Sequence, residues 1–455
     1  MEDAKSQIEE LLQQPDGQVG GEPPANATPQ VTNEPATDSG APLPSGNELP
    51  PVENKNNNKT IIILLVLLIV ILLVIGGVLL ATNWNNWFGT SNTATNETET
   101  EVVAENTDLK GGTVTVEVGG KSITYSGAYI VDGTEATISS GEYASATDNQ
   151  AVFVVANGGT LTIDGDVKIS KTGSADFDGR GDNYSFYGLN SAIVVVGEGS
   201  SLTVKGATIE TDTPGANAVI AVDSAHAVVG QTTITTTKDG SRGLHATYGG
   251  GIDAYEVKIS TQGGSSAALA TDRGSGAIKA EAMELETAGA GSPLVYSTGE
   301  IVVSGSTGTA TGSQIAVVEG KNMIEFANCE FSANGNGNRN GVDNAGVMIY
   351  QSMSGDADEG MGIFNVTDSV LTVLDSSSVY TATPFFFVTN TTAKIVAINS
   401  VINYSPEQSL ITAIGTNEWG QSGANGGIVQ YSLTNTETTN TDVVVDSISS
   451  ASIVE

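Results

Sequence analysis

The sequence predicts an all-β fold, a parallel β-helix, on three observations. A motif of the form apolar-x-apolar-x-x-small-x-apolar recurs along the chain, as in "LTVKGATI" at residues 202–209. Within each motif apolar and polar residues alternate with period two and β-branched residues are frequent, which is typical of strands. Gly and Asn gather between the motifs, where a chain of short strands must turn. Little of this region favours helix.

The spacing of the motif indicates a solenoid. Its first apolar residue falls at Leu161, Leu202, Ala227, Ile252, Ile278, Ile301, Ile324, Phe364 and Val396. Five of the eight intervals are 23 to 26 residues long, and the longer ones carry insertions. A period of twenty-odd residues is typical of stacked coils. Leucine-rich repeats are not supported, because the denser Leu pattern and the Asn ladder that they need are missing.

In such a stack the strands of successive coils pair about 4.8 Å apart, and inward side chains form columns. One coil cannot bury its own inner face, so stability comes from neighbouring coils. We expect a first column of Leu202, Ala227, Ile252, Ile278, Ile301 and Ile324, and a second of Val204, Val229, Ala254, Ala280, Val303 and Phe326.

The N-terminal part of the chain lacks the repeat and contains a long apolar run. Residues 61–81 contain no charge and are long enough to cross a bilayer as a helix. Two lysines precede this run and three aromatic residues follow it, which places the N-terminal side in the cytoplasm. We expect a disordered cytoplasmic tail at 1–59, a transmembrane signal-anchor helix at 60–82, an extracellular stalk at 83–108 and the β-helix at 109–455.

Composition excludes several functions. Asp and Glu number 52 against 17 Lys and Arg, a net charge of −35, which argues against nucleic-acid binding. Cys329 is the single cysteine, so an intrachain disulfide is excluded, and its inward position predicts a small buried side chain. HExxH, CxxC, GxSxG and P-loop patterns are missing, so zinc hydrolase, serine hydrolase and nucleotidase functions are not supported.

Polar segments of individual character precede the predicted strand pairs. They read "SFYGLNSA" (185–192), "SRGLHATYGGG" (241–251), "ATDRGSGA" (270–277), "VYSTGE" (295–300), "VVEGKN" (317–322), "MIYQSMSGDADEG" (348–360) and "FFVTNTTA" (386–393). Because a solenoid brings equal phases to one edge, these corners predict a polar ligand-binding face of Asn190, His245, Tyr248, Asp272, Arg273, Glu319, Lys321, Tyr350, Gln351 and Asn390. For His245, a hydrogen-bonded corner residue is the simpler alternative to a ligand or base.

The strings "FYGLNSA", "ATDRGSG", "YSTGEI", "VEGKN", "YQSMSGDA" and "VTNTTA" resemble those of bacterial cell-surface, adhesin-like right-handed β-helix proteins. That group is related in architecture to the pectate-lyase-like superfamily, and the resemblance covers about residues 150–400. It implies a surface-displayed, right-handed, single-stranded parallel β-helix. It implies no reaction.

Three interpretations of the polar corners stay open. A polysaccharide lyase would use Arg273 or Lys321 as base and Asp272 and Glu319 as ligands of a cation. A glycoside hydrolase would use the carboxyls of Asp272, Glu300 and Glu319. Arg273 and Lys321 lie two coils apart, roughly 10 Å, which suits binding successive units of a glycan better than one proton transfer. The third interpretation is that these residues only form turns and corner ion pairs.

Acidic insertions suggest a cation. Asp176, Asp178 and Asp182 stand close together among glycines and resemble a Ca²⁺ loop in composition, without the Glu at the twelfth position of an EF-hand. A solvated loop is the alternative there. Asp356, Asp358 and Glu359 in the stretch 354–360 are a second candidate cation site. Ca²⁺ is therefore the one cofactor that the sequence suggests.

These features together predict a single-pass cell-membrane protein whose extracellular domain binds a glycan or a surface protein, and so serves adhesion or glycan binding. Repeating sites along a stack suit a linear polymer, because weak contacts add through effective concentration. The alternative is a polysaccharide lyase or glycoside hydrolase acting on an extracellular polysaccharide, acidic ones included.

Overall fold

The computed structural model describes residues 109–175, 182–337, 342–352, 355–374, 383–419 and 426–454. All of them belong to one unit, residues 99–455. The predicted tail, membrane-spanning helix and stalk all lie outside these ranges and stay predictions. In the part of the chain that the structure describes, no helix is long and apolar enough to span a membrane. The helix α3 (Asp182–Ser185) is a single turn.

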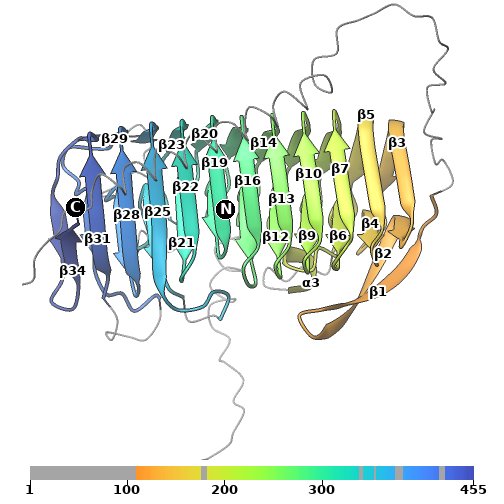
Figure 1. The fold of residues 1–455 in the computed structure, drawn as a ribbon, viewed down its shortest axis with the longest axis horizontal. Helices are drawn as coiled ribbons and strands as arrows, with labels where there is room; N and C mark the ends of the chain where they lie inside the picture. The colour runs from red at the N-terminus through yellow and green to blue at the C-terminus, as the bar shows by residue number, and fades with distance from the viewer. Residues whose placement is uncertain are drawn as a thin grey trace, which may run out of the picture. The chain divides into compact units, whose positions relative to one another are not determined.

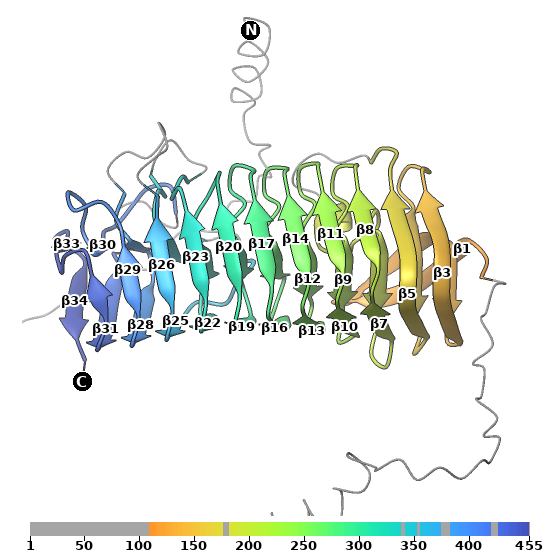
Figure 2. The ribbon, with the colours of Figure 1, turned by 90° about the horizontal axis from the view of Figure 1, so that it is seen from above.

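The described chain winds in coils that each contribute strands to three walls, called here wall A, wall B and wall C (Figures 1 and 2). Wall A contains β2 (Lys121–Asp132), β4 (Ala151–Ala156), β6 (Ile193–Val196), β9 (Val219–Val222), β12 (Leu244–Thr247), β15 (Leu269–Asp272), β18 (Val295–Ser297), β21 (Ala316–Glu319), β24 (Val347–Tyr350), β27 (Phe386–Thr389), β30 (Ile411–Ala413) and β33 (Val443–Val445).

Wall B contains β3 (Glu135–Ser145), β5 (Thr160–Lys171), β7 (Ser201–Lys205), β10 (His226–Gly230), β13 (Gly251–Tyr255), β16 (Ala277–Glu281), β19 (Glu300–Ser304), β22 (Met323–Ala327), β25 (Met361–Thr367), β28 (Thr392–Ile398), β31 (Ile428–Thr434) and β34 (Ser450–Ile453). Wall C contains β8 (Thr208–Thr211), β11 (Thr233–Thr236), β14 (Lys258–Thr261), β17 (Glu284–Thr287), β20 (Thr307–Ala310), β23 (Glu330–Ala333), β26 (Val370–Val373), β29 (Val401–Asn403) and β32 (Glu437–Thr438).

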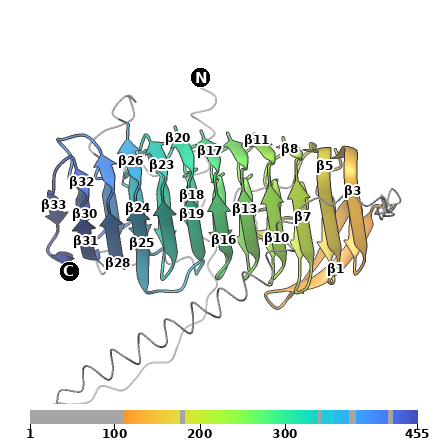
Figure 3. The same ribbon diagram turned by 45° about the horizontal axis from the view of Figure 1, so that its top comes forward.

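The strands of each wall run parallel and follow one another in chain order (Figure 3). The exception is β1 (Gly112–Val118), which pairs antiparallel with β2. This hairpin, at the orange end of the stack in Figure 1, was not predicted from the sequence. All-β composition, long parallel sheets and a coil-by-coil return of the chain are the arrangement of a parallel β-helix, as predicted.

The register of wall B confirms most of the first predicted column. Leu202 pairs with Leu161 and with Ala227, and the column continues in register as far as Phe364. The prediction is wrong at Val396, because Phe364 pairs with Ile395 instead. Ile395 is fully buried, whereas Val396 is half-buried. Since side chains alternate across a strand, an error of one residue moves the chosen side chain to the other face.

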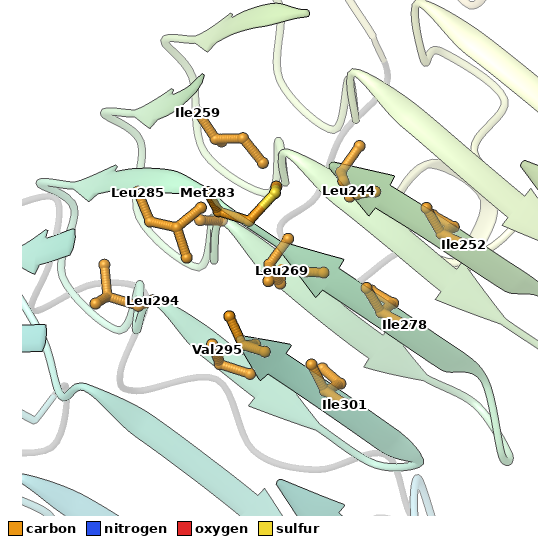
Figure 4. Close-up of a cluster of buried hydrophobic side chains, with 14 of the residues drawn as sticks. Leu244, Ile252, Ile259, Leu269, Ile278, Met283, Leu285, Leu294, Val295 and Ile301 are labelled. Carbon is orange, nitrogen blue, oxygen red and sulfur yellow. The ribbon is translucent and has the colours of Figure 1, made fainter. Parts of the chain in front are cut away.

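The interior is filled by aliphatic side chains from all three walls. Figure 4 shows Leu244 and Leu269 of wall A close to Ile252 and Ile278 of wall B, with Ile259 of wall C beside them. All five are almost completely buried. Complete burial of such a side chain contributes about 1.5–3 kcal/mol, and each coil repeats the contribution. Cys329 is buried as predicted, and burial raises the pKa of its thiol.

Wall A was not recognised as strand in the sequence. Several of its strands overlap the segments predicted to be polar corners: β12 lies within "SRGLHATYGGG" and β21 overlaps the start of "VVEGKN". Both faces of β12 and β21 are buried, so the period-two alternation that marks a half-buried strand is missing. The second face is buried because other parts of the chain cover the outer side of this wall.

Two apolar covers lie on that outer side. At the N-terminal end Val118 and Tyr125 of the hairpin pack with Tyr187 against outward residues of β6 and β9. Further along, Ala345 and Trp419 pack against Val317, Met348 and Phe387. The outward side chains of β12, β15 and β18 lie between the two covers, and this gap positions the candidate site.

Candidate functional site

A turn leads from each wall A strand to the next wall B strand, and these turns form one row. The first turn residue has a left-handed backbone at Tyr248 (φ 51°), Arg273 (φ 53°) and Asn390 (φ 59°). Asn tolerates this conformation, whereas for Tyr and Arg it costs roughly 1–2 kcal/mol. Lys321 and Gln351 lie in equivalent turns of their coils. The predicted alignment of polar residues along one edge is therefore present for these five residues.

The other predicted residues lie next to this row or away from it. Asp272, Glu319 and Tyr350 each end a wall A strand, one position before the turn. His245 lies inside β12. The prediction is wrong for Asn190, which precedes β6 and so lies at the opposite end of wall A. Its amide nitrogen donates to Thr213 Oγ1 and to the carbonyl of Pro214, both at 3.3 Å.

The segment 355–360, which follows β24, returns to the row and pairs with its basic residues. Asp356 forms an ion pair with Arg273, and Asp358 Oδ2 lies 2.9 Å from Lys321 Nζ. These carboxylates face separate bases, so the prediction of a cation site in 354–360 is not supported. Within the described ranges, no three His, Cys, Asp or Glu side chains converge as metal ligands would.

Backbone contacts anchor the same segment. The amide nitrogen of Lys321 donates to the carbonyl of Asp358 at 3.0 Å, and Gln351 Nε2 donates to the carbonyl of Ala357 at 3.1 Å. Thr391 Oγ1 donates to the carbonyl of Gly360 at 3.0 Å. The turns of neighbouring coils thus hold the segment in place, which fixes where its carboxylates lie.

A cavity of about 310 Å³, called here the turn cavity, lies between this segment and the row. Arg273 and Lys321 line it from coils two apart, with their partners Asp356 and Asp358. The rest of its lining is polar or small: Tyr248, Gly274, Ser275, Thr298, Asn322, Gly355 and Ala357. Tyr248 stacks on Tyr187 with ring centroids 5.3 Å apart, so one aromatic edge of the cavity is fixed.

A second cavity of about 210 Å³, called here the sheet cavity, lies over the outer face of wall A between the two apolar covers. Its charged and phenolic lining consists of Arg242, Asp272, Tyr296 and Asp356. The Phe186 ring, Ser265, Ala267, Gly291 and Pro293 complete it. Asp356 lines both cavities, so they adjoin at this side chain.

The charged groups of the sheet cavity are paired with one another. Asp272 Oδ2 lies 3.0 Å from His245 Nε2 and 3.4 Å from Arg242 Nη2. Burial, and next the Arg242 charge, lower the pKa of His245 to about 4. His245 is therefore neutral at pH 7 and donates its Nε2 hydrogen to Asp272. The Phe186 ring centroid lies 4.4 Å from the Arg273 guanidinium and 5.6 Å from that of Arg242.

Glu319 lies in a buried network of hydroxyl groups that shares Tyr296 with the sheet cavity. Its carboxyl accepts hydrogen bonds from the Tyr296, Tyr350 and Ser352 hydroxyls. Burial raises the pKa of Glu319, and it raises the pKa of the Tyr296 and Tyr350 phenols too. Glu319 is not among the side chains that line the turn cavity or the sheet cavity. Its contacts are those of a group that ties wall A to the chain after β24.

The structure does not assemble the carboxylates that a hydrolase was predicted to use. Asp272 lines the sheet cavity, Glu319 lies in the hydroxyl network, and Glu300 starts β19 as an exposed residue of wall B. Asp176 and Asp178 lie outside the described residues, and Asp182 begins α3 with a side chain that is not described. Ca²⁺ at these aspartates stays a prediction.

The sequence pattern did not identify Phe186, Arg242 and Tyr296 as site residues, although all three lie in the polar segments quoted above. The available signal was the phase of Tyr296, which faces outward because Val295 beside it faces the core. Phe186 carried no comparable signal, since only the fold brings it close to Arg242 and Arg273. Gln351 and Asn390 line neither of these cavities; they line a third one.

Comparisons with known proteins add little to this geometry. No family model matches the chain, and no curated protein matches it significantly. A solved structure that aligns with it is the crystal structure of alginate lyase from Paenibacillus sp. str. FPU-7. The alignment covers 63% of this chain and 92% of that chain, with 8% identity and a TM-score of 0.33. At this level of similarity, no activity is carried over from that protein to this one.

Proposed function

We propose that the β-helix binds a linear glycan along the row of turns, with the turn cavity as the main site and the sheet cavity beside it. One observation carries the proposal: Arg273 and Lys321, from coils two apart, line a single cavity together with the carboxylates that pair with them. The repeat of the coils then matches the repeat of a polymer.

The chemistry of the cavity suits hydroxyl groups. Sugar hydroxyls both donate and accept hydrogen bonds, and the paired side chains offer guanidinium and ammonium hydrogens next to carboxylate oxygens. Hydrogen bonds to charged groups are stronger than those between neutral groups. The bases already have carboxylate partners and the chain carries −35, so the site needs no anion and repels polyanions at long range. A neutral glycan therefore fits better than an acidic one.

The test is titration calorimetry of the full chain with neutral and acidic polysaccharides. Replacing Arg273 with Gly, which suits its left-handed turn, and Lys321 with Ala should each weaken binding about tenfold or more. Lys279→Ala is the matched control, because Lys279 is an exposed lysine of β16 on wall B. Equal affinity in all four proteins, or no binding to any polysaccharide, would remove the turn cavity from the proposal.

A second candidate function is cleavage of a polysaccharide as a lyase or hydrolase. It is favoured by the meeting of Arg242, Asp272 and Tyr296 in the sheet cavity, where a guanidinium, a carboxylate and a phenol face the same space. Incubation with acidic polysaccharides should then produce ultraviolet absorbance from unsaturated products, and Tyr296→Phe should slow it. New reducing ends without that absorbance would indicate hydrolysis instead. If neither unsaturated products nor new reducing ends form, only the binding function remains.

We further propose that residues 60–82 anchor the protein in the cell membrane with the N-terminus in the cytoplasm. We also propose that the β-helix is right-handed. The uncharged run at 61–81 supports the anchor. The strong preference of parallel crossovers for that hand supports the winding. Protease added to intact cells should degrade the C-terminal domain and spare an N-terminal tag. Protection of the C-terminal domain would contradict this topology.

A further inference from the structure

The stack of coils ends in the strands β32, β33 and β34, called here the end coil; β34 lies at the blue end of the stack in Figure 1. β34 pairs with β31, β33 with β30 and β32 with β29. Among the described residues none of the three pairs with a further strand. One edge of each wall therefore keeps unpaired backbone groups, and such an edge is a template for another strand.

The inward columns of the core end uncovered at this coil. In wall B, Ile395 pairs with Tyr431 and Tyr431 pairs with Ile453. Ile395 is fully buried, Tyr431 is half-buried and Ile453 is 74% exposed. In wall A the fully buried Ala413 pairs with Val445, which is 45% exposed. Because a coil buries its inner face only against neighbouring coils, the end coil leaves apolar surface in contact with water.

The opposite end of the stack is covered. Val131, Ala136 and Ile138 of the first coil are at most 4% exposed. Leu109, at the start of the described chain, packs against the core there, and β1 pairs with β2. The fold thus closes one end with its own chain, whereas the described residues leave the other end open.

The end coil also lacks the features by which proteins protect a free edge, such as charged residues and proline. β33 reads VVV and β34 reads SASI, so neither strand contains them. The amide nitrogens of Ser450 and Val454 donate to carbonyls of the preceding coil at 3.0 Å and 2.9 Å. Since backbone groups of successive strand residues point to opposite sides, those of Ala451 and Ile453 point to the free edge.

The charge of this end limits the partner. Residues 426–454 contain Glu437, Asp442 and Asp446 but neither Lys nor Arg. A second copy of this chain would bring the same carboxylates and a further charge of −35, so repulsion disfavours it. A strand with basic residues at its ends is attracted instead.

We infer that the end coil is a docking site for an extended segment of another protein, which adds to wall B beside β34 as a further strand. This segment carries apolar residues at alternate positions, which cover the open column, and Lys or Arg at its ends. Main-chain hydrogen bonds then supply affinity, and the alternate side chains supply specificity. The inference does not rest on the proposed glycan site, because residues 428–454 line neither the turn cavity nor the sheet cavity.

Fluorescence anisotropy of labelled nine-residue peptides with the full chain tests the inference. The peptide KTVTISVTK has the alternation and the basic ends, and we expect it to bind. KTTVIVSTK has the same composition without the alternation, and ETVTISVTE has acidic ends; both should bind at least tenfold more weakly. Ile453→Asn should weaken binding of KTVTISVTK about tenfold. The matched control is Val370→Asn, at an exposed aliphatic residue of wall C, which should leave binding unchanged.

Several outcomes would overturn the inference: no saturable binding, equal binding of the two basic peptides, tightest binding of ETVTISVTE, or unchanged affinity in Ile453→Asn. Light scattering that shows a dimer in wild type and a monomer in Ile453→Asn would also overturn it, because a second copy would then occupy the end coil. Circular dichroism shows whether each variant is folded. If Ile453→Asn is unfolded, Val445→Asn repeats the test at the exposed end of the wall A column.

Discussion

Asp272 is the residue on which the charge arrangement of the candidate site depends. Its carboxylate oxygen Oδ2 lies 3.0 Å from His245 Nε2 and 3.4 Å from Arg242 Nη2, and its side chain lines the sheet cavity. The sequence indicated that Asp272 and His245 matter but assigned them to a polar corner. In the structure His245 is fully buried within a strand. Its pairing with Asp272 depends on neighbouring strands of wall A, and sequence spacing alone cannot show that.

The titration of His245 predicts an acid-sensitive stability. The pKa of His245 is 6.5 in its ordinary state and about 4 in the fold, because burial disfavours the charged ring. Between these values the unfolded chain binds a proton that the folded chain does not, so stability falls as pH is lowered from about 6.5 to about 4. The full effect is at most about 3 kcal/mol. Urea unfolding at pH 7 and pH 4 measures it.

His245→Gln should remove this part of the pH dependence while the rest persists. His226→Gln is the control, because His226 is half exposed beside Asp253 on wall B. The interpretation fails if wild type and His245→Gln lose the same stability between the two pH values.

At the scale of elements, the inward columns of wall B could be read from sequence and wall A could not. Motifs on wall B alternate between a buried and an exposed face, as in β7 and β16, and period two reveals that pattern. β12 and β21 are buried on both faces, because Phe186 lies over the outer side of β12 and the residues around Ala345 lie over that of β21. The same parts of the chain border the sheet cavity. The wall A strands and the sheet cavity therefore escaped prediction for the same reason.

The register at β28 gives a sharp prediction. Ile395→Asp should destabilise the protein by about 4 kcal/mol or more. It places a charge in the buried column of wall B, next to Phe364. Val396→Asp should be much milder, because this side chain is half-buried on the other face. Denaturant unfolding of both variants decides between the two registers. A larger loss for Val396→Asp would support the register predicted from the sequence.

The left-handed turns predict an order among variants of Arg273. Gly and Ala at this position both remove the ion pair with Asp356, but only Ala keeps the cost of a side chain at φ 53°. Arg273→Gly should therefore be about 1 kcal/mol more stable than Arg273→Ala. Thermal unfolding compares them, and equal melting temperatures would show that the turn relaxes instead of holding this backbone.

At the scale of the whole molecule, acidic residues far outnumber basic ones along the chain, and the fold is held together by contacts between neighbouring coils. The net charge is −35, and ion pairs such as Lys258–Glu284 are well exposed. Exposed pairs contribute about 0–1 kcal/mol each. Repulsion among the unpaired carboxylates should therefore outweigh them.

Added salt should for this reason stabilise the protein. Raising NaCl from about 10 mM to about 150 mM shortens the Debye length from about 30 Å to about 8 Å. That screens the repulsion over much of the surface, so the melting temperature should rise. Calorimetric scans in a series of NaCl concentrations provide the measurement, with uncharged sucrose as a control for general solute effects. A melting temperature that falls with salt would mean that the ion pairs dominate.

The sequence alone predicts the parallel β-helix, the inward columns as far as Phe364 and the row of turns that carries Arg273 and Lys321. These follow from local alternation and from the length of the repeat, because each depends only on contacts with the next coil. The three-dimensional fold was needed to show that 355–360 returns to pair with Arg273 and Lys321, that Phe186 contacts the two arginines, and that Gln351 and Asn390 line one cavity. Those contacts join residues brought together by insertions of irregular length, and no periodic pattern records where an insertion returns.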